Sequence, residues 1–241
     1  MEGNASVWNR AWTVLKDIFF PLFCFSCKKE GSVLCQTCVQ AIEVPGMFFC
    51  PVCTKEDVHG NVCLSCAPQS FLDSHIALFP YTDESVPARL IHDLKYNYIE
   101  SAVDPFAQFF SVFFQKHSSV FSSVECVAPV PLHPRRFAER GFNQSDKIVG
   151  LIKKQTGLPI KQVLKRSVFT RPQVGLSSEH RKKNVQGIFA LNTDVQGKSI
   201  LLVDDVYTTG STLQECAKVL KENGAKEVHG FSLARAVSEN R

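Results

Sequence analysis

The stretch LLVDDVYTTGST at residues 201–212 constrains the fold of this chain more than any other feature. A run of aliphatic residues ends in two adjacent acids, Asp204 and Asp205, and continues into small hydroxyl residues around Gly210. A short apolar run without alternation is typical of a central strand in a parallel sheet, which is buried on both faces. The stretch therefore predicts a buried strand that delivers two carboxylates and a small-residue turn to one edge of a sheet.

Strand and helix patterns alternate over much of the 241-residue chain. We expect strands at 75–81, 124–132, 199–203 and 226–234, and helices at 85–96, 106–115, 143–157 and 211–224. In the last helix, Thr212 and Glu215 have the spacing of a capping box. This alternation predicts an α/β fold with a mostly parallel sheet flanked by helices, in which ligands bind at the carboxyl ends of the strands.

The turn after the two acids has the composition of a phosphate-binding site. Gly210 lets the backbone curl so that several N–H groups converge, and the following helix N-terminus favours an anion. Hydroxyl donors come from its four other residues, Thr208, Thr209, Ser211 and Thr212. The turn has no lysine and no GxxxxGK[ST] pattern, which excludes a Walker loop. A sugar phosphate would place its phosphate in the turn and its hydroxyls on the acids; the alternative is a capped surface turn.

Cysteine spacing predicts metal centres in the first third of the chain. Of ten cysteines, eight form four CxxC pairs: Cys24/Cys27, Cys35/Cys38, Cys50/Cys53 and Cys63/Cys66. Two intervening residues let both thiolates reach one tetrahedral ion, and such pairs in a cytosolic protein bind metal more often than they form disulfides. We expect two structural zinc sites, Cys24-Cys27-Cys35-Cys38 and Cys50-Cys53-Cys63-Cys66, with an interleaved pairing as the alternative.

These patterns divide the chain into two predicted domains. Residues 1–67 would hold an amphipathic N-terminal helix and the zinc module, and residues 75–241 the α/β domain. The apolar start at 9–25 contains Lys16 and Asp17 and has no small-residue cleavage site, so we predict no signal peptide. The later apolar run at 106–115 is too short to span a bilayer. We therefore expect a cytoplasmic protein without membrane insertion.

Basic residues are concentrated in the middle of the chain, although the net charge is only +4. Thirteen of the 27 Lys and Arg residues lie between His133 and Lys183, together with three acids. This segment predicts a polyanionic partner, with a solvated basic face as the alternative. Arg135 and Arg136 follow a predicted strand and would reach the carboxyl edge, where arginine suits bidentate phosphate contacts. A Pro-rich loop with solvated arginines is the alternative there.

The stretch at 201–212 resembles the phosphoribosyl-pyrophosphate (PRPP) motif of type I phosphoribosyltransferases. The resemblance implies that Asp204 and Asp205 lie at the catalytic centre and bind the ribose hydroxyls. It implies further that the turn binds the 5′-phosphate and that Mg²⁺ bridges ribose and pyrophosphate oxygens. Pyrophosphate would be held by the arginines of the basic segment, namely Arg135, Arg136 and Arg140. A mobile loop over the site would be formed by residues 170–184, with Arg171, Gln173 and Arg181; an irregular surface connection is the alternative.

Other segments resemble the ComF/GntX family over essentially the whole chain. They are the cysteine-rich head, LIHDLKY at 90–96, PVPLHPRRFAERGFNQS at 129–145, RSVFTRPQVGLSSEHRKKNVQGIF at 166–189 and the late LAR. The head has eight cysteines, where some relatives keep four. In GFNQS, Asn143 would either touch the ligand or cap the next helix.

The family resemblance implies a Mg²⁺-dependent PRPP-binding protein, expected to be a phosphoribosyltransferase in DNA uptake, natural transformation or nucleotide metabolism. Its expected partners are PRPP, single-stranded DNA and proteins of the competence machinery. One alternative is a non-catalytic single-stranded DNA-binding competence factor with PRPP as a ligand, and another is a zinc-stapled scaffold. The sequence shows no segment recognisable as a purine or pyrimidine pocket.

Overall fold

The computed structural model describes residues 21–168 and 185–236. The predicted N-terminal helix at 1–20 and the predicted mobile loop with Arg171, Gln173 and Arg181 lie outside these residues. The chain forms two compact units, Met1–Glu43 and Val44–Arg241. The second set of four cysteines therefore shares a compact unit with the sheet, whereas the sequence grouped all eight cysteines in residues 1–67.

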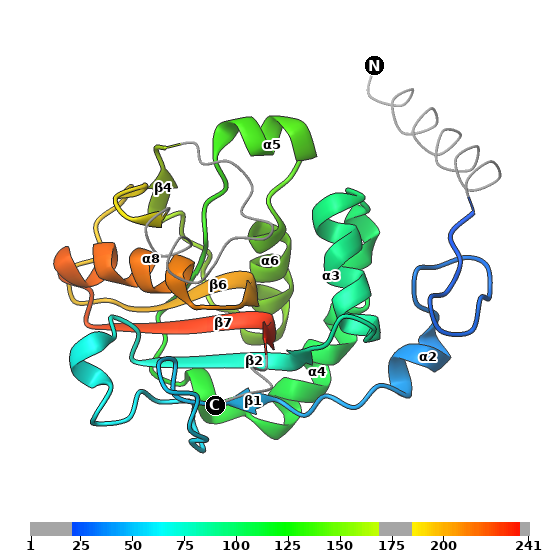
Figure 1. The fold of residues 1–241 in the computed structure, drawn as a ribbon, viewed down its shortest axis with the longest axis horizontal. Coiled ribbons are helices and arrows are strands. Elements are labelled where there is room, and N and C mark those ends of the chain that lie inside the picture. The colour runs from blue at the N-terminus through cyan, green and yellow to red at the C-terminus, as the bar shows by residue number, and fades with distance from the viewer. Residues whose placement is uncertain (1–20, 169–184, 237–241) are drawn as a thin grey trace. The chain divides into compact units, whose positions relative to one another are not determined.

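Five strands of the larger unit form one sheet in the order β1-β2-β7-β6-β3 (Figure 1). Their bounds are β1 Met47–Phe48, β2 Ser74–Tyr81, β3 Cys126–Pro129, β6 Ser199–Tyr207 and β7 Glu227–Ala236. The pairs β2–β7, β7–β6 and β6–β3 are parallel, and only the short edge strand β1 is antiparallel. The predicted mostly parallel sheet is thus confirmed. A separate antiparallel pair joins β4 Leu164–Arg166 to β5 Phe189–Leu191.

Helices connect the parallel strands, as crossover connections require. The described α-helices of the larger unit include α3 Val86–Tyr96, α4 Phe106–Lys116, α5 Pro134–Arg140, α6 Gln144–Thr156 and α8 Ser211–Glu222. Short 3₁₀ turns occur at η1 Ala67–Gln69, η2 Glu100–Val103 and η3 Ser118–Phe121. Among the described residues, no helix is long and apolar enough to cross a membrane.

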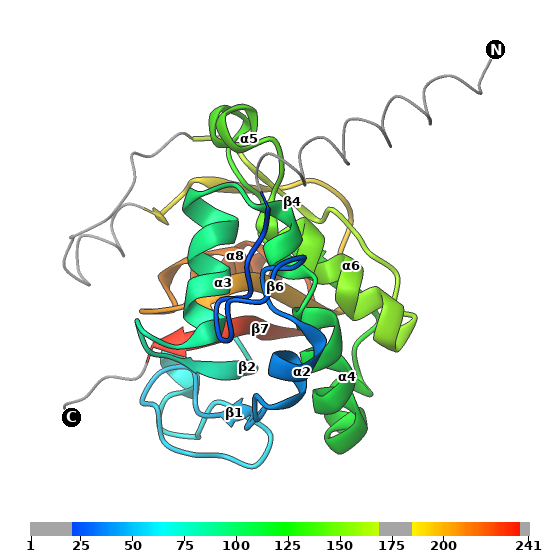
Figure 2. The ribbon, with the colours of Figure 1, turned by 90° about the vertical axis from the view of Figure 1, so that its right-hand side faces the viewer.

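The two faces of the sheet are covered by different helices (Figures 1 and 2). Side chains alternate between the faces of a strand, so Ile200 and Leu202 point one way and Val203 the other. Ile200 and Leu202 belong to a buried cluster that includes four residues of α8, namely Leu213, Cys216, Ala217 and Leu220. On the opposite face, Phe231, the register partner of Val203, lies against Phe110 of α4, with ring centroids 5.5 Å apart.

Two predicted strand ends were misplaced, and both differences shape the site. β3 ends at Pro129 rather than at residue 132, because proline has no N–H to continue a ladder and Pro131 and Pro134 follow closely. β6 runs on to Tyr207, since Asp204 and Val206 continue the pairing with β7. Val203 faces the last residue of β3, so Asp204 begins the part of β6 that extends past β3. The acids therefore lie where one neighbouring strand has ended.

Candidate functional site

The phosphate turn, residues 208–212, connects the end of β6 to α8. Gly210 is the N-cap of α8 and has φ 74°, and Thr209 Oγ1 accepts a hydrogen bond from the Ser211 N–H at 3.4 Å. The predicted capping box does not form, because Glu215 Oε1 instead accepts a hydrogen bond from Gly187 N–H at 2.8 Å. Thr209 Oγ1 and Ser211 Oγ are 2.7 Å apart. The amide dipoles at the α8 N-terminus are directed at the turn, where an anion is favoured.

Two adjoining cavities open beside the phosphate turn. The smaller one, about 60 Å³, is lined by Val185, Asp204 and the continuous segment 206–213. The larger, about 380 Å³, shares Val185, Thr209 and Ser211 with it. Its other walls are apolar and amide side chains, such as Val52, Phe71 and Gln214, together with the acid Glu215. Sequence analysis found no such second cavity, because its walls come from segments more than 100 residues apart.

Asp204 and Asp205 have different surroundings because they occupy consecutive positions of a strand. Asp204 lines the smaller cavity and lies 3.5 Å from Ser145 Oγ at the start of α6. Asp205 is 7% exposed and makes an ion pair with Lys95 of α3, with Lys95 Nζ 2.7 Å from Asp205 Oδ1. Asp204 thus shares the small cavity with the turn, whereas Asp205 pairs with Lys95 and is not among the residues that line this cavity.

Lys95 is a site residue that the sequence analysis did not identify. It lies in the last turn of α3, and its side chain is 24% exposed. Burial opposes its charge, but the attraction of Asp205 and then of Asp204 outweighs burial and raises the pKa of Lys95. The only available signal was its position in LIHDLKY, where it looks like an ordinary basic residue near a helix C-terminus.

Lys95 pairs with Asp205, and the charges of Arg140 and Arg166 also act on Asp205 and Asp204, so the negative charge of the two carboxylates is partly balanced. Burial and the charge of Asp205 raise the pKa of Asp204 to about 7, although Lys95 lowers it. Oxygen ligands and negative charge suit a hard cation such as Mg²⁺, or the hydroxyl donors of a sugar. The residues present therefore fit a Mg²⁺-bound sugar phosphate. Its metal ion or its hydroxyl groups would be the partner of the Asp204 carboxylate.

Replacing Asp204 with asparagine should stabilise the folded protein at pH 8. The folded-state pKa lies above the ordinary value of 3.8, so the carboxylate lowers stability as the pH rises from about 4 towards 7. Allowing for partial exposure, we expect a gain on the order of 2 kcal/mol at pH 8 and almost none at pH 4. Urea unfolding of both proteins at the two pH values measures this. A difference that does not depend on pH would contradict the assignment.

The predicted pyrophosphate arginines lie on a helix rather than on a loop. Arg135, Arg136 and Arg140 belong to α5, which begins at Pro134, as proline favours the first turn of a helix, and ends at Gly141 in the left-handed conformation. α5 stands away from the sheet in both views (Figures 1 and 2). Arg140 Cζ lies 6.0 Å from the Tyr98 ring centroid, and its charge is attracted to Asp205.

Asn143 has a structural role in the described site. Its Oδ1 accepts a hydrogen bond from Ser145 N–H at 3.2 Å, and its amide donates to the Val130 carbonyl at 3.0 Å. The residue is the N-cap of α6 and is 6% exposed. Of the two predicted roles for GFNQS, the structure shows the helix cap.

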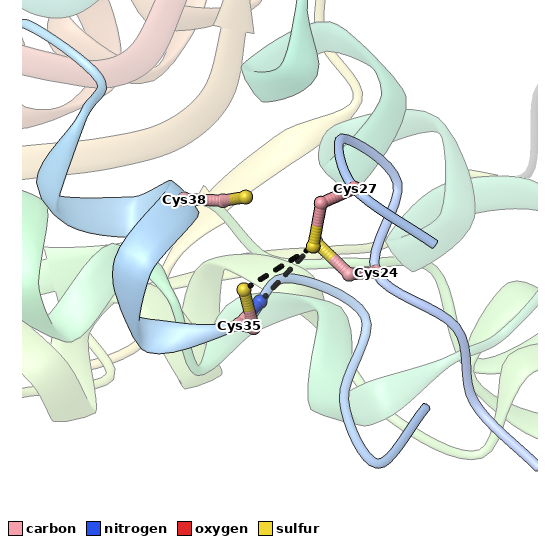
Figure 3. Close-up of side chains that lie close together, drawn as sticks. All are labelled: Cys24, Cys27, Cys35 and Cys38. Atoms are coloured by element: carbon pink, nitrogen blue, oxygen red, sulfur yellow. Dashed lines mark hydrogen bonds between the residues drawn. The ribbon is translucent and has the colours of Figure 1, made fainter. Parts of the chain in front are cut away.

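The eight predicted metal-binding cysteines form two sequential quartets. In the first cysteine quartet, Cys24, Cys27, Cys35 and Cys38, all sulfur atoms lie within 4.8 Å of one another, as they do in the second cysteine quartet, Cys50, Cys53, Cys63 and Cys66. Figure 3 shows the first quartet, in which Cys27 Sγ is 3.6 Å from Cys35 Sγ and the Cys35 N–H donates to Cys24 Sγ at 3.4 Å. The interleaved pairing is therefore wrong.

The geometry of the quartets fits a tetrahedral ion. A tetrahedron with Zn–S bonds of about 2.3 Å has edges of about 3.8 Å. In the second quartet, Cys63 Sγ lies 3.8 Å from Cys50 Sγ and 3.7 Å from Cys53 Sγ, far longer than a disulfide bond. The Ser65 hydroxyl and Cys66 lower the pKa of Cys63 to about 6, whereas Cys63 and then burial raise that of Cys66 to about 12. Four thiolates therefore need a cation, and either quartet could hold a structural zinc ion.

Comparison with known proteins identifies a domain and a group of relatives. Residues 142–239 match the family model of the phosphoribosyl transferase domain. The DNA utilization protein YhgH of Salmonella typhimurium is 29% identical over 90% of this chain and 98% of its own length. Competence protein ComFC of Streptococcus pneumoniae is 29% identical over 86% of this chain and 90% of its own. Competence protein F of Haemophilus influenzae is 37% identical over 46% of this chain and 51% of its own.

Proposed function

We propose that this chain is a member of the ComF family, which the names of its relatives support, and that it binds PRPP with Mg²⁺ at the end of β6. We propose further that it acts as a phosphoribosyltransferase in DNA uptake or nucleotide metabolism. The names of the relatives, which refer to competence and to DNA utilization, support the first of these settings.

The observation that carries this proposal is the coincidence of the phosphate turn and the acid pair on one strand end. Gly210 begins α8 at the turn, and Asp204 lines the same small cavity as the turn. Amide dipoles and hydroxyls suit the 5′-phosphate, while carboxylates suit hydroxyl donors. A ligand that combines both groups within a few ångströms is a phosphorylated sugar.

The surrounding residues have distinct roles in this proposal. Asp204 and Asp205 accept hydrogen bonds from the ribose hydroxyls, and Lys95 holds Asp205 in place through their 2.7 Å ion pair. Mg²⁺, when bound, supplies positive charge between ribose and pyrophosphate oxygens. Arg140, whose charge already interacts with Asp205, is the α5 residue best supported as a pyrophosphate contact. Arg135 and Arg136 of α5 would add positive charge.

A second candidate function is binding of single-stranded DNA, with PRPP as a ligand rather than a substrate. It is supported by the thirteen basic residues between positions 133 and 183, three of which lie on α5, where Arg135 is exposed. A basic surface binds the phosphate backbone with strong salt dependence. Proteins of the competence machinery would then be natural partners.

Calorimetry with PRPP, with and without added Mg²⁺, tests the proposed function. We expect binding that requires Mg²⁺, and much weaker binding of ribose 5-phosphate, which lacks the pyrophosphate. Incubation with PRPP, Mg²⁺ and candidate acceptors, including single-stranded DNA, then tests turnover through pyrophosphate release. Release that depends on an acceptor supports a transferase, whereas tight DNA binding without release supports the second candidate. Absence of PRPP binding in Mg²⁺ would refute both.

A further inference from the structure

The second cysteine quartet is joined to the carboxyl ends of β6 and β7 by two buried side chains. Tyr207 Oη donates to the Pro51 carbonyl at 2.7 Å. Arg235 donates from Nη2 to the Cys50 carbonyl at 3.1 Å and from Nη1 to the Phe49 carbonyl at 3.4 Å. Tyr207 and Arg235 are each 3% exposed. Three successive carbonyls around the first CxxC pair of this quartet are therefore fixed by residues of the central sheet.

Tyr207 and Arg235 also contact each other, together with His75 of β2. The Arg235 Cζ atom lies 4.9 Å from the Tyr207 ring centroid, and the His75 and Tyr207 centroids are 3.9 Å apart. Burial, and then the charge of Arg235, lower the pKa of His75 well below its ordinary value. His75 is therefore neutral and can accept from Arg235 at Nδ1, 3.5 Å away. The three side chains form one packed, hydrogen-bonded layer.

Arg235 is a buried cation without a carboxylate partner in the described part of the chain. Burial lowers its pKa, while attraction to Tyr207, Cys50 and Cys53 opposes that change. Four thiolates on a divalent ion carry a net negative charge, so an occupied second quartet supplies the countercharge that a buried guanidinium needs.

Tyr207 carries this connection to the phosphate turn. The residue immediately precedes the turn and lines the small cavity above it. Its phenol fills the space beside Gly210, because a Cβ built at position 210 would lie 2.1 Å from Oη and 2.4 Å from Cζ. The same hydroxyl that bonds Pro51 thus supports the floor of the turn. A shift of the Cys50–Cys53 backbone would therefore move both the Tyr207 side chain and the phosphate turn.

We propose that Tyr207 and Arg235 are positioning residues that make the anion affinity of the phosphate turn depend on metal in the second cysteine quartet. This inference rests on the proposed function, since it assumes that the turn binds the PRPP phosphate. The first cysteine quartet offers an internal control, because it has the same four ligands but belongs to the other compact unit.

The test compares Cys53→Ser with Cys27→Ser, which alter exposed cysteines at equivalent places in the two quartets. Each variant should lose one of the two bound metal ions. Cys53→Ser should weaken PRPP binding at least tenfold and speed amide hydrogen exchange in residues 206–213, measured without ligand. Cys27→Ser should change both by less than twofold. Equal effects of the two variants, or no effect of Cys53→Ser, would overturn the proposal.

Tyr207→Phe provides a test that leaves both quartets intact, should Cys53→Ser not fold. It removes only the hydroxyl, so the metal content of the quartets should not change. Amide hydrogen exchange in residues 206–213 should become faster, and the affinity for PRPP should fall about fivefold. Adding Tyr207→Phe to Cys53→Ser should cause no further loss of PRPP affinity, because both substitutions act through the bond between Tyr207 and Pro51. If the double variant instead loses affinity by the product of the two single losses, the proposed connection is refuted. If the unaltered protein binds no PRPP, the proposed function fails, and the ligand-free exchange data still decide the coupling.

Discussion

Replacing Asp204 and Asp205 together with asparagine should abolish Mg²⁺-dependent PRPP binding, by at least a hundredfold in affinity. Asparagine keeps the shape of each side chain but removes the charge that attracts Mg²⁺ and strengthens hydrogen bonds from hydroxyls. The metal content of the cysteine quartets should stay the same, since neither acid is a ligand. Calorimetry and metal analysis on the same preparations measure both quantities. Undiminished binding would rule out the acid pair as the sugar site.

The single variants separate loss of binding from loss of folding. Asp204→Asn relieves a carboxylate whose pKa is raised to about 7 and should stabilise the protein at pH 8. Asp205→Asn removes the partner of Lys95 and should destabilise it by about 1–3 kcal/mol. Both should weaken PRPP binding although their stability effects are opposite in sign. Glu222→Gln, at the far end of α8, is the control for loss of a carboxylate and should bind normally.

Local sequence patterns were sufficient for the sheet and for the turn. The apolar run before Asp204 marked β6, and the predicted helix at 143–157 agrees with α6, bounded by Asn143 and Gly157. These features depend on periodicity and on caps, which are properties of neighbouring residues. The two cysteine quartets were equally accessible, because CxxC spacing reflects the reach of two thiolates within one turn.

The missed features depend on residues that are distant in the sequence. Lys95 meets Asp205 only because α3 packs beside β7 and β2. The bond from Tyr207 to Pro51 spans 156 positions. The capping box between Thr212 and Glu215 was a sound local expectation, but Gly187 provided Glu215 with a partner from another segment. Tertiary contacts of this kind override local propensity and leave no periodic signal.

Replacing Gly210 with alanine should destroy the phosphate turn and reduce PRPP affinity at least fiftyfold. The residue has φ 74°, which costs a non-glycine residue about 1 kcal/mol, and the new methyl group would overlap the Tyr207 phenol. The ring must move to relieve this overlap, and doing so breaks its bond to the Pro51 carbonyl. We therefore expect a further loss of folding stability, to a total of about 2–4 kcal/mol.

Two other glycines separate the causes of this effect. Gly157 has φ 73° but open space around its Cβ position, so Gly157→Ala should cost only the backbone strain of about 1 kcal/mol and leave binding intact. Gly150 lies within α6 with open space and no positive φ, so Gly150→Ala should stabilise by about 0.5–1 kcal/mol. Urea unfolding and PRPP calorimetry on the three variants measure these effects. If Gly210→Ala behaves like Gly157→Ala, the contact with Tyr207 does not shape the turn. If it loses affinity while Gly157→Ala does not, the geometry of residues 208–212 is what holds the phosphate.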